Sequence, residues 1–149
     1  MQFAQIRDQV EVDGAASPID LSALHGMWVN SNPDSSGIAR MVISGKNGRL
    51  TVQVSAIGPD GPIDWGTVDV TILTSAPSSR IAAGFTCRYD FGFVEIRLQA
   101  MILKGLIVLA ELHRFKDDSK RVDYFVREYF ALDHGRYSGP IHQVTENPQ

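Results

Sequence analysis

Apolar and polar residues alternate along most of this chain, and this pattern constrains the fold more than any other feature. The alternation recurs from about residue 24 to residue 132, whereas the spacing of an amphipathic helix is almost absent. Segments rich in Gly, Pro, Asn, Asp and Ser separate the alternating runs, as turns separate strands. The pattern predicts eight strands, at residues 24–30, 38–44, 49–57, 64–74, 80–89, 91–103, 106–115 and 121–132.

The connections between these runs are too short for the crossover that a parallel pair of strands needs, so neighbouring strands are expected to be antiparallel. The predicted fold class is all-β, an eight-stranded antiparallel meander that closes into a barrel, because closure removes unpaired edges. A chain of 149 residues suits one domain. We expect the barrel to span about 24–132, with an N-terminal extension at 1–23 and a tail at 133–149.

Two tight turns predict which residues face each other. A turn at Lys104-Gly105 places Leu98 opposite Glu111 and Ile96 opposite His113 on the inner face, and a turn at Asn47-Gly48 fixes the first hairpin. Alternation assigns further inner positions, which are Met41, Ile43, Leu50, Val52, Val54, Val68, Val70, Ile72, Ile81, Ala83, Phe85, Cys87, Tyr89, Tyr124, Val126, Glu128 and Phe130. The same alternation assigns outer positions, which are Arg40, Gln53, Ser55 and Trp65.

The first predicted strand contains Gly26-x-Trp28-x-Asn30. This segment resembles the start of the calycin superfamily, in which lipocalins open with Gly-x-Trp and avidins with Gly-x-Trp-x-Asn. The resemblance implies an eight-stranded barrel in which Trp28 packs at one end and Asn30 contacts the ligand. It also implies a small, mostly apolar ligand, although a few calycins are enzymes.

Inward polar residues gather at one end of the predicted barrel, because alternate turns of a meander lie together. That end also carries the longer connections, at 31–37 and 58–63, so we expect it to be an open mouth. The residues expected there are Asn30, Asp64, Cys87, Tyr89, Glu111, His113 and Tyr124.

Glu111 and His113 are the candidate catalytic residues, since both project from one side of an otherwise apolar strand. Buried groups of this kind need partners. They either act as general acid and base or orient a ligand, or they hydrogen-bond each other, Tyr124 or water at a wet rim. The candidate ligand-binding residues are Asn30, Asp64, Tyr89, Tyr124, Trp28 and Phe85. Cys87 is expected in the core, and Glu128 either pairs with a basic group such as Arg97 or is a buried acid with a role.

Three functions follow from a barrel of this size, whose interior either holds one small ligand or is filled by side chains. The leading hypothesis is the binding of one small, largely apolar molecule. The alternative is a cyclase or isomerase that needs no cofactor and moves a proton with Glu111 and His113. The third is a structural module with a filled interior. We expect neither a cofactor nor a metal, because no ligand motif with metal-site spacing occurs.

Charge and surface patterning predict the partners. A net charge of -3 and a pI near 5.7 disfavour nucleic acid and anionic membranes. The first residues lack the apolar run of a signal peptide, so we expect a cytoplasmic protein. The strands at 91–103 and 106–115 also carry apolar residues outward, among them Met101, Val108 and Leu112. This pattern predicts a homodimer through strands six and seven, with a chain terminus that covers this face as the alternative.

Overall fold

A computed structural model describes residues 18–134 of the chain, and these residues form one antiparallel sheet of nine strands. The strands are β1 (Gly26–Asn30), β2 (Ile38–Lys46), β3 (Arg49–Gly58), β4 (Gly61–Asp69), β5 (Thr71–Thr74), β6 (Ala82–Asp90), β7 (Val94–Leu103), β8 (Leu106–Phe115) and β9 (Tyr124–Leu132). The prediction of an all-β, antiparallel fold is confirmed.

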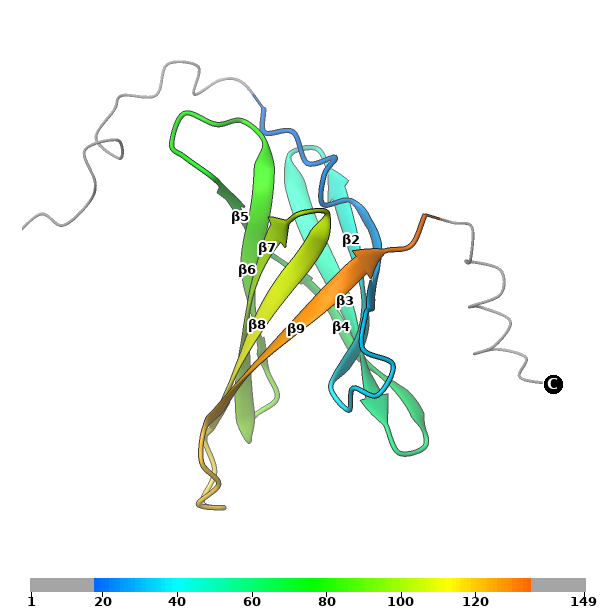
Figure 1. Ribbon diagram of the computed structural model, residues 1–149. Helices are drawn as coiled ribbons and strands as arrows, with labels where there is room; N and C mark the ends of the chain where they lie inside the picture. The colour runs from blue at the N-terminus through cyan, green and yellow to red at the C-terminus, as the bar shows by residue number, and fades with distance from the viewer. Residues whose placement is uncertain (1–17, 135–149) are drawn as a thin grey trace, which may run out of the picture.

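The sheet is strongly curled but does not close, so the predicted eight-stranded closed barrel is wrong. The strand order is β4-β3-β2-β1-β9-β8-β7-β6-β5, in which the first and last strands of the chain pair in the middle. In Figure 1, β5 to β7 form one wall and β2 to β4 the opposite wall, with β8 and β9 crossing between them. The fold is a half-barrel.

The sheet opens because the predicted strand at 64–74 changes partners in its middle. Its first part, β4, pairs with β3 as far as Asp69, and the backbone N–H of Val70 still donates to Leu50 O at 3.1 Å. From Thr71 onward the chain pairs with β6 instead. The two pieces are adjacent in the chain but form opposite edges of the sheet. The hydroxyl of Tyr89 on β6 crosses the gap and donates to Gly66 O on β4 at 2.8 Å.

A β-bulge in β4 reverses the predicted faces at the start of that strand. Val54 pairs with Gly66 and Ser55 pairs with Asp64, which leaves Trp65 as the extra residue. Gly66 has a φ of 92°, a conformation that favours glycine. Trp65 is therefore half-buried against the core, and Asp64 lies on the exposed side. Both differ from the prediction, whereas Ser55 pairs with Arg40 and Asp64 on the outer face as predicted, although its side chain is buried.

A second bulge, between β5 and β6, has the same effect. Leu73 pairs with Gly84 and Thr74 pairs with Ala82, so Ala83 is the extra residue. Ala82 is buried in place of Ala83, and Ile81, predicted to face inward, is 58% exposed. The predicted longer connection at 58–63 is also wrong, because Gly58 pairs with Gly61 across a two-residue turn.

The hairpin registers predicted from the two tight turns are confirmed. Leu98 pairs with Glu111 and Ile96 with His113, and Met41 pairs with Val54 in the first hairpin. Both turns hold two residues in the left-handed region, with φ of 55° and 77° at Asn47 and Gly48. Such turns match the twist of the strands they join.

Apolar side chains fill the space between the two walls. The core includes Phe85 and Phe130 at 0% exposure and Trp28 at 2%. The Trp28 indole N–H donates to Leu24 O at 2.9 Å, which satisfies the one polar atom of this ring. Among residues 18–134, no helix is long and apolar enough to cross a membrane.

Candidate functional site

A pocket of about 380 Å³ lies where the inner faces of β8 and β9 meet the β1–β2 connection and the β3–β4 hairpin. We call it the mouth pocket. Its lining residues are Ser35, Ser36, Gly37, Ala56, Ile57, Ile63, Trp65, Glu111, His113, Tyr124, Val126 and Glu128. The volume falls in the range of small-molecule sites.

β8 and β9 present three polar side chains to the mouth pocket. Glu111 is 2% exposed, and its Oε1 lies 3.4 Å from Nε2 of His113, which is two residues further along β8. Tyr124 is the cross-strand partner of His113, and the two rings stack with their centroids 4.3 Å apart and their planes 10° apart. Burial raises the pKa of the Tyr124 hydroxyl, so the phenol stays protonated. The structure therefore brings together Glu111, His113 and Tyr124.

Glu128 on β9 is the second acid of the mouth pocket. Its Oε2 accepts a hydrogen bond from the Asn30 amide at 2.8 Å and another from the Ser35 hydroxyl. A Cβ at Gly37 would lie only 3.0 Å from Glu128 Oε1, so the β1–β2 connection packs directly on this carboxyl group. The partners of Glu128 are neutral donors and Glu111, which shows that it is a partly buried acid rather than half of an ion pair with Arg97.

Glu111 and Glu128 interact directly and their pKa values move apart. Burial raises the pKa of Glu111 to about 7, and the carboxylate of Glu128 adds to this effect. Burial alone would also raise the pKa of Glu128, but hydrogen bonds from Glu111, Ser35 and Asn30 outweigh it and hold this pKa below its ordinary value. At pH below about 7, Glu111 is thus a carboxylic acid that donates to an ionised Glu128.

The proton on Glu111 explains two otherwise orphaned atoms. In residues 18–134, Glu111 Oε2 and Glu128 Oε1 are buried side-chain oxygens that have no hydrogen-bond partner. Leaving buried acceptors unpaired is costly. A single proton shared between the two carboxyl groups removes this cost, as in other carboxyl pairs that cannot both ionise.

This arrangement can supply three chemical functions to a bound molecule. The protonated acid can donate a hydrogen bond or a proton, the ionised acid can accept one, and the imidazole of His113 can do either according to its state. The apolar side chains of Trp65, Ile63 and Val126 line the same pocket. Groups of this kind in a pocket, with pKa values that differ, are typical of functional sites.

The remaining predicted site residues lie elsewhere. The side-chain amide of Asn30 donates hydrogen bonds to Glu128 and to Ile38 O, and Asn30 does not line the mouth pocket. Asp64 is exposed and accepts from Gln53 Nε2 at 2.6 Å and from the Gly66 N–H at 2.8 Å, so it holds the bulge. Tyr89 is buried and bridges the gap in the sheet, while Trp28 and Phe85 lie in the core.

Cys87 is half-buried and packs against the core, as predicted. Burial raises the pKa of its thiol to about 12, so the reactive thiolate is scarce. A metal site from Glu111, His113 and Asp64 does not form, because Asp64 points away. No other group of three metal-ligating residues exists in the described part of the chain.

Sequence reasoning missed Ser35 and Trp65 as parts of the pocket. Ser35 lies in a connection, where alternation gives no direction. Trp65 was assigned to the outer face, and only the bulge at Gly66 turns it inward. The one signal that could have located the bulge is the Asp64-Trp65-Gly66 sequence, because glycine inside a strand pattern often marks a bulge.

Comparisons of the chain with protein-family models, with curated proteins and with solved structures found no match.

Proposed function

We propose that this protein binds one small, largely apolar molecule in the mouth pocket and orients a polar group of that molecule with Glu111, His113 and Tyr124. The observation that carries the proposal is a small pocket with apolar wall that contains a nearly inaccessible carboxyl group. Such pockets use apolar surface for affinity and a few placed polar groups for orientation.

The ligand occupies the mouth and not the centre of the half-barrel. Phe85, Phe130 and Met41 are completely buried and fill the space between the walls. The resemblance of Gly26-x-Trp28-x-Asn30 to the calycin superfamily agrees with binding of a small apolar molecule. The site proposed here is, however, shallower than a lumen that runs through a closed barrel.

A neutral dye that fluoresces in apolar surroundings, N-phenyl-1-naphthylamine, tests the proposal. The expected result is saturable binding of one dye molecule per chain. Val126→Trp, which fills the pocket, should weaken binding at least about tenfold, because it removes the apolar volume that the dye occupies. Val42→Trp is the matched control, since Val42 is half-buried on β2 and does not line the pocket.

Two results would contradict the proposal. The first is a failure of the dye to saturate, and the second is equal loss of binding in the Val126 and Val42 variants. Native mass spectrometry of the protein as purified adds an independent readout. A co-purified adduct of constant mass that is absent from the Val126→Trp variant would support the site and identify the molecule.

The second candidate function is acid–base catalysis of a cyclisation or isomerisation in the same pocket. The pairing of protonated Glu111 with ionised Glu128 favours it, because one group holds a proton at neutral pH while its neighbour is ready to accept one. The apolar wall would hold a flexible substrate in a reactive conformation.

Glu111→Gln distinguishes binding from catalysis once the adduct is identified. In a carrier, this substitution should weaken binding, because Glu111 only orients the ligand. In an enzyme, binding should persist and turnover should be lost. Ser36→Ala is the control, because Ser36 lines the pocket but makes no side-chain hydrogen bond within the described residues.

We also propose a homodimer through the outer faces of β7 and β8 near the turn that joins them. Two apolar side chains there are about half exposed, Met101 at 56% and Leu103 at 52%, and Val108 is the cross-strand partner of Met101. Apolar patches of this kind mark contact surfaces. Light scattering coupled to gel filtration should give twice the chain mass for the wild type and a single chain for Met101→Arg. A wild-type monomer would contradict the dimer.

A further inference from the structure

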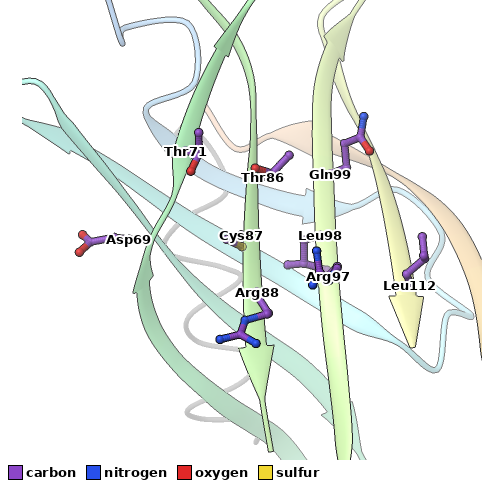
Figure 2. A pocket seen from close by; sticks show the side chains of 9 residues that line it. All are labelled: Asp69, Thr71, Thr86, Cys87, Arg88, Arg97, Leu98, Gln99 and Leu112. Atoms are coloured by element: carbon purple, nitrogen blue, oxygen red, sulfur yellow. The ribbon is translucent and has the colours of Figure 1, made fainter. Parts of the chain in front are cut away.

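We propose that Arg88 and Arg97 form a binding site for a phosphate group on the outer face of β6 and β7. The site shares no residue with the mouth pocket and stands independently of the function proposed for that pocket. Figure 2 shows the pocket, in which side chains from neighbouring strands gather on one surface. Its volume is about 610 Å³.

The strand register places hydrogen-bond donors in two adjacent rows. Thr71, Thr86 and Gln99 are aligned across β5, β6 and β7. Arg88, two residues after Thr86 on β6, lies directly opposite Arg97, which is two residues before Gln99 on β7. All five residues line the pocket. Like charges that face each other across two strands are unfavourable unless an anion lies between or beside them.

One glutamate holds the arginines in place. Glu95 is 4% exposed, although its strand neighbours on the same face are open to solvent, because guanidinium groups cover it. Its Oε2 accepts from Arg88 Nη1 at 2.7 Å, and its Oε1 lies 3.4 Å from Arg97 Nε and 3.5 Å from Arg114 Nη1. One negative charge thus organises three positive charges, which leaves an excess of positive charge at this surface.

Most donors of Arg88 and Arg97 have no partner within residues 18–134. The side chains of Arg88 and Arg97 are 57% and 66% exposed, and each uses one nitrogen for Glu95. A guanidinium group has five N–H bonds in a planar fork that matches phosphate oxygens. Held on one side by Glu95, both groups can present their other side to a ligand without a large loss of side-chain freedom.

The neutral donors beside them are also free. Within residues 18–134, the hydroxyls of Thr71 and Thr86 and the amide of Gln99 make no side-chain hydrogen bond. The acidic residue at the pocket edge, Asp69, is bound by Arg49 at 2.6 Å, and Figure 2 shows it pointing away from Arg88. A phosphate group has several acceptor oxygens, so two guanidinium groups together with hydroxyl and amide donors suit it better than a lone charge would.

Titration with inorganic phosphate, followed by ¹⁵N–¹H NMR at constant ionic strength, tests the site. We expect saturable shifts confined to the amides of residues 71, 86, 88, 97 and 99. Glycerol 3-phosphate distinguishes the source of the group. Tighter binding than inorganic phosphate would assign the site to a phosphate ester, and weaker binding would assign it to free phosphate.

Variants separate a built site from general charge attraction. Arg88→Gln and Arg97→Gln should each weaken phosphate binding at least about tenfold, because each removes charge-assisted hydrogen bonds. Arg88→Lys keeps the charge but loses the planar fork, so it should also bind more weakly than the wild type. Arg127→Gln, an exposed arginine of β9 outside the pocket, should bind as the wild type does.

Three results would overturn the proposal. They are shifts that do not saturate, equal shifts with chloride in place of phosphate, and the same loss of binding in Arg127→Gln as in Arg88→Gln. Arg88→Lys keeps a positive charge beside Glu95, so this variant is expected to fold. Weaker phosphate binding by Arg88→Lys therefore reports on the site and not on unfolding.

Discussion

Glu111 and Glu95 are almost equally hidden from solvent, at 2% and 4% exposure, yet their pKa values move in opposite directions. Glu111 is hidden by the core and by another acid, and its pKa rises to about 7. Glu95 is hidden by arginines, and the hydrogen bond from Arg88 lowers its pKa. The comparison teaches that a small exposed area does not by itself decide whether a carboxyl group keeps its proton: depth in the core raises the pKa of Glu111, and contact with cations lowers the pKa of Glu95.

The two glutamates therefore suit different tasks. The inner one stores a proton next to a pocket with apolar wall, which is useful for binding or proton transfer. The outer one is a permanent anion that gathers cations, which suits an anion site. Three predictions test this contrast, beginning with the largest expected effect.

Glu111→Gln should remove a loss of stability that the wild type shows as pH rises. The folded pKa of Glu111 lies above its unfolded value, so its stabilising contribution is complete below about pH 4.5 and is lost as pH rises through about 7. The loss should reach up to about 3 kcal/mol by pH 8. Gln mimics the protonated acid, so the variant should match the wild type at pH 5 and exceed it at pH 8.

Urea unfolding between pH 5 and pH 8 measures this effect. Titration of Glu128 does not contribute between pH 5 and pH 8, because its lowered pKa affects the stability of the protein only below about pH 4.5. If wild type and variant showed the same pH dependence, Glu111 would not be the group that titrates.

Much of the inner site was predictable because tight turns fix register. Asn47-Gly48 and Lys104-Gly105 each allow one pairing, and the second placed Glu111 and His113 on the inner face correctly. Tyr124 was predicted beside them because β9 follows β8 in a simple hairpin.

What was missed depends on single extra residues and on a change of partner. The bulge at Trp65 reverses the faces of Trp65 and Asp64, and the bulge at Ala83 does the same for Ile81. Neither leaves a strong trace in an alternating pattern. The opening of the sheet at Val70 depends on which strand competes better for the chain after Asp69, which is a long-range property that local patterning does not encode.

Glu95→Gln should destabilise the protein at low salt, because three guanidinium groups lose their common anion. Part of this loss should be recovered in about 500 mM NaCl, which screens the repulsion among the arginines. Thermal unfolding at low and high salt measures both effects. Asp69→Asn is the matched control, since its pair with Arg49 is exposed on both sides and should contribute little.

The contrast with the inner site makes this prediction specific. Glu111→Gln should show no such dependence on salt, because within residues 18–134 the one ion-pair partner of Glu111 is His113. A Glu95→Gln variant that unfolds at the same temperature as the wild type at low salt would mean that the three arginines do not need their shared anion.

Ser35→Ala should have the smallest effect. It removes one donor from Glu128, so the folded pKa of Glu128 should rise toward its ordinary value. A carboxyl group whose pKa is lower in the folded state stabilises the protein above its unfolded pKa. This stabilisation is lost as pH falls through the folded pKa. The variant should therefore lose about 1 kcal/mol at pH 7 and less at pH 3. Ser36→Ala, the neighbouring exposed serine, should match the wild type in urea unfolding, and equal losses in both would argue against the role of Ser35.

The central claim is that the mouth pocket holds one protonated and one ionised carboxyl group, and ¹³C NMR of the glutamate side-chain carboxyl carbons tests it directly. A pH titration, with Glu111→Gln and Glu128→Gln used to assign the two signals, should show Glu111 titrating near pH 7 and Glu128 below its ordinary value. Titration of both groups near about 4.5, as for independent exposed glutamates, would contradict the account.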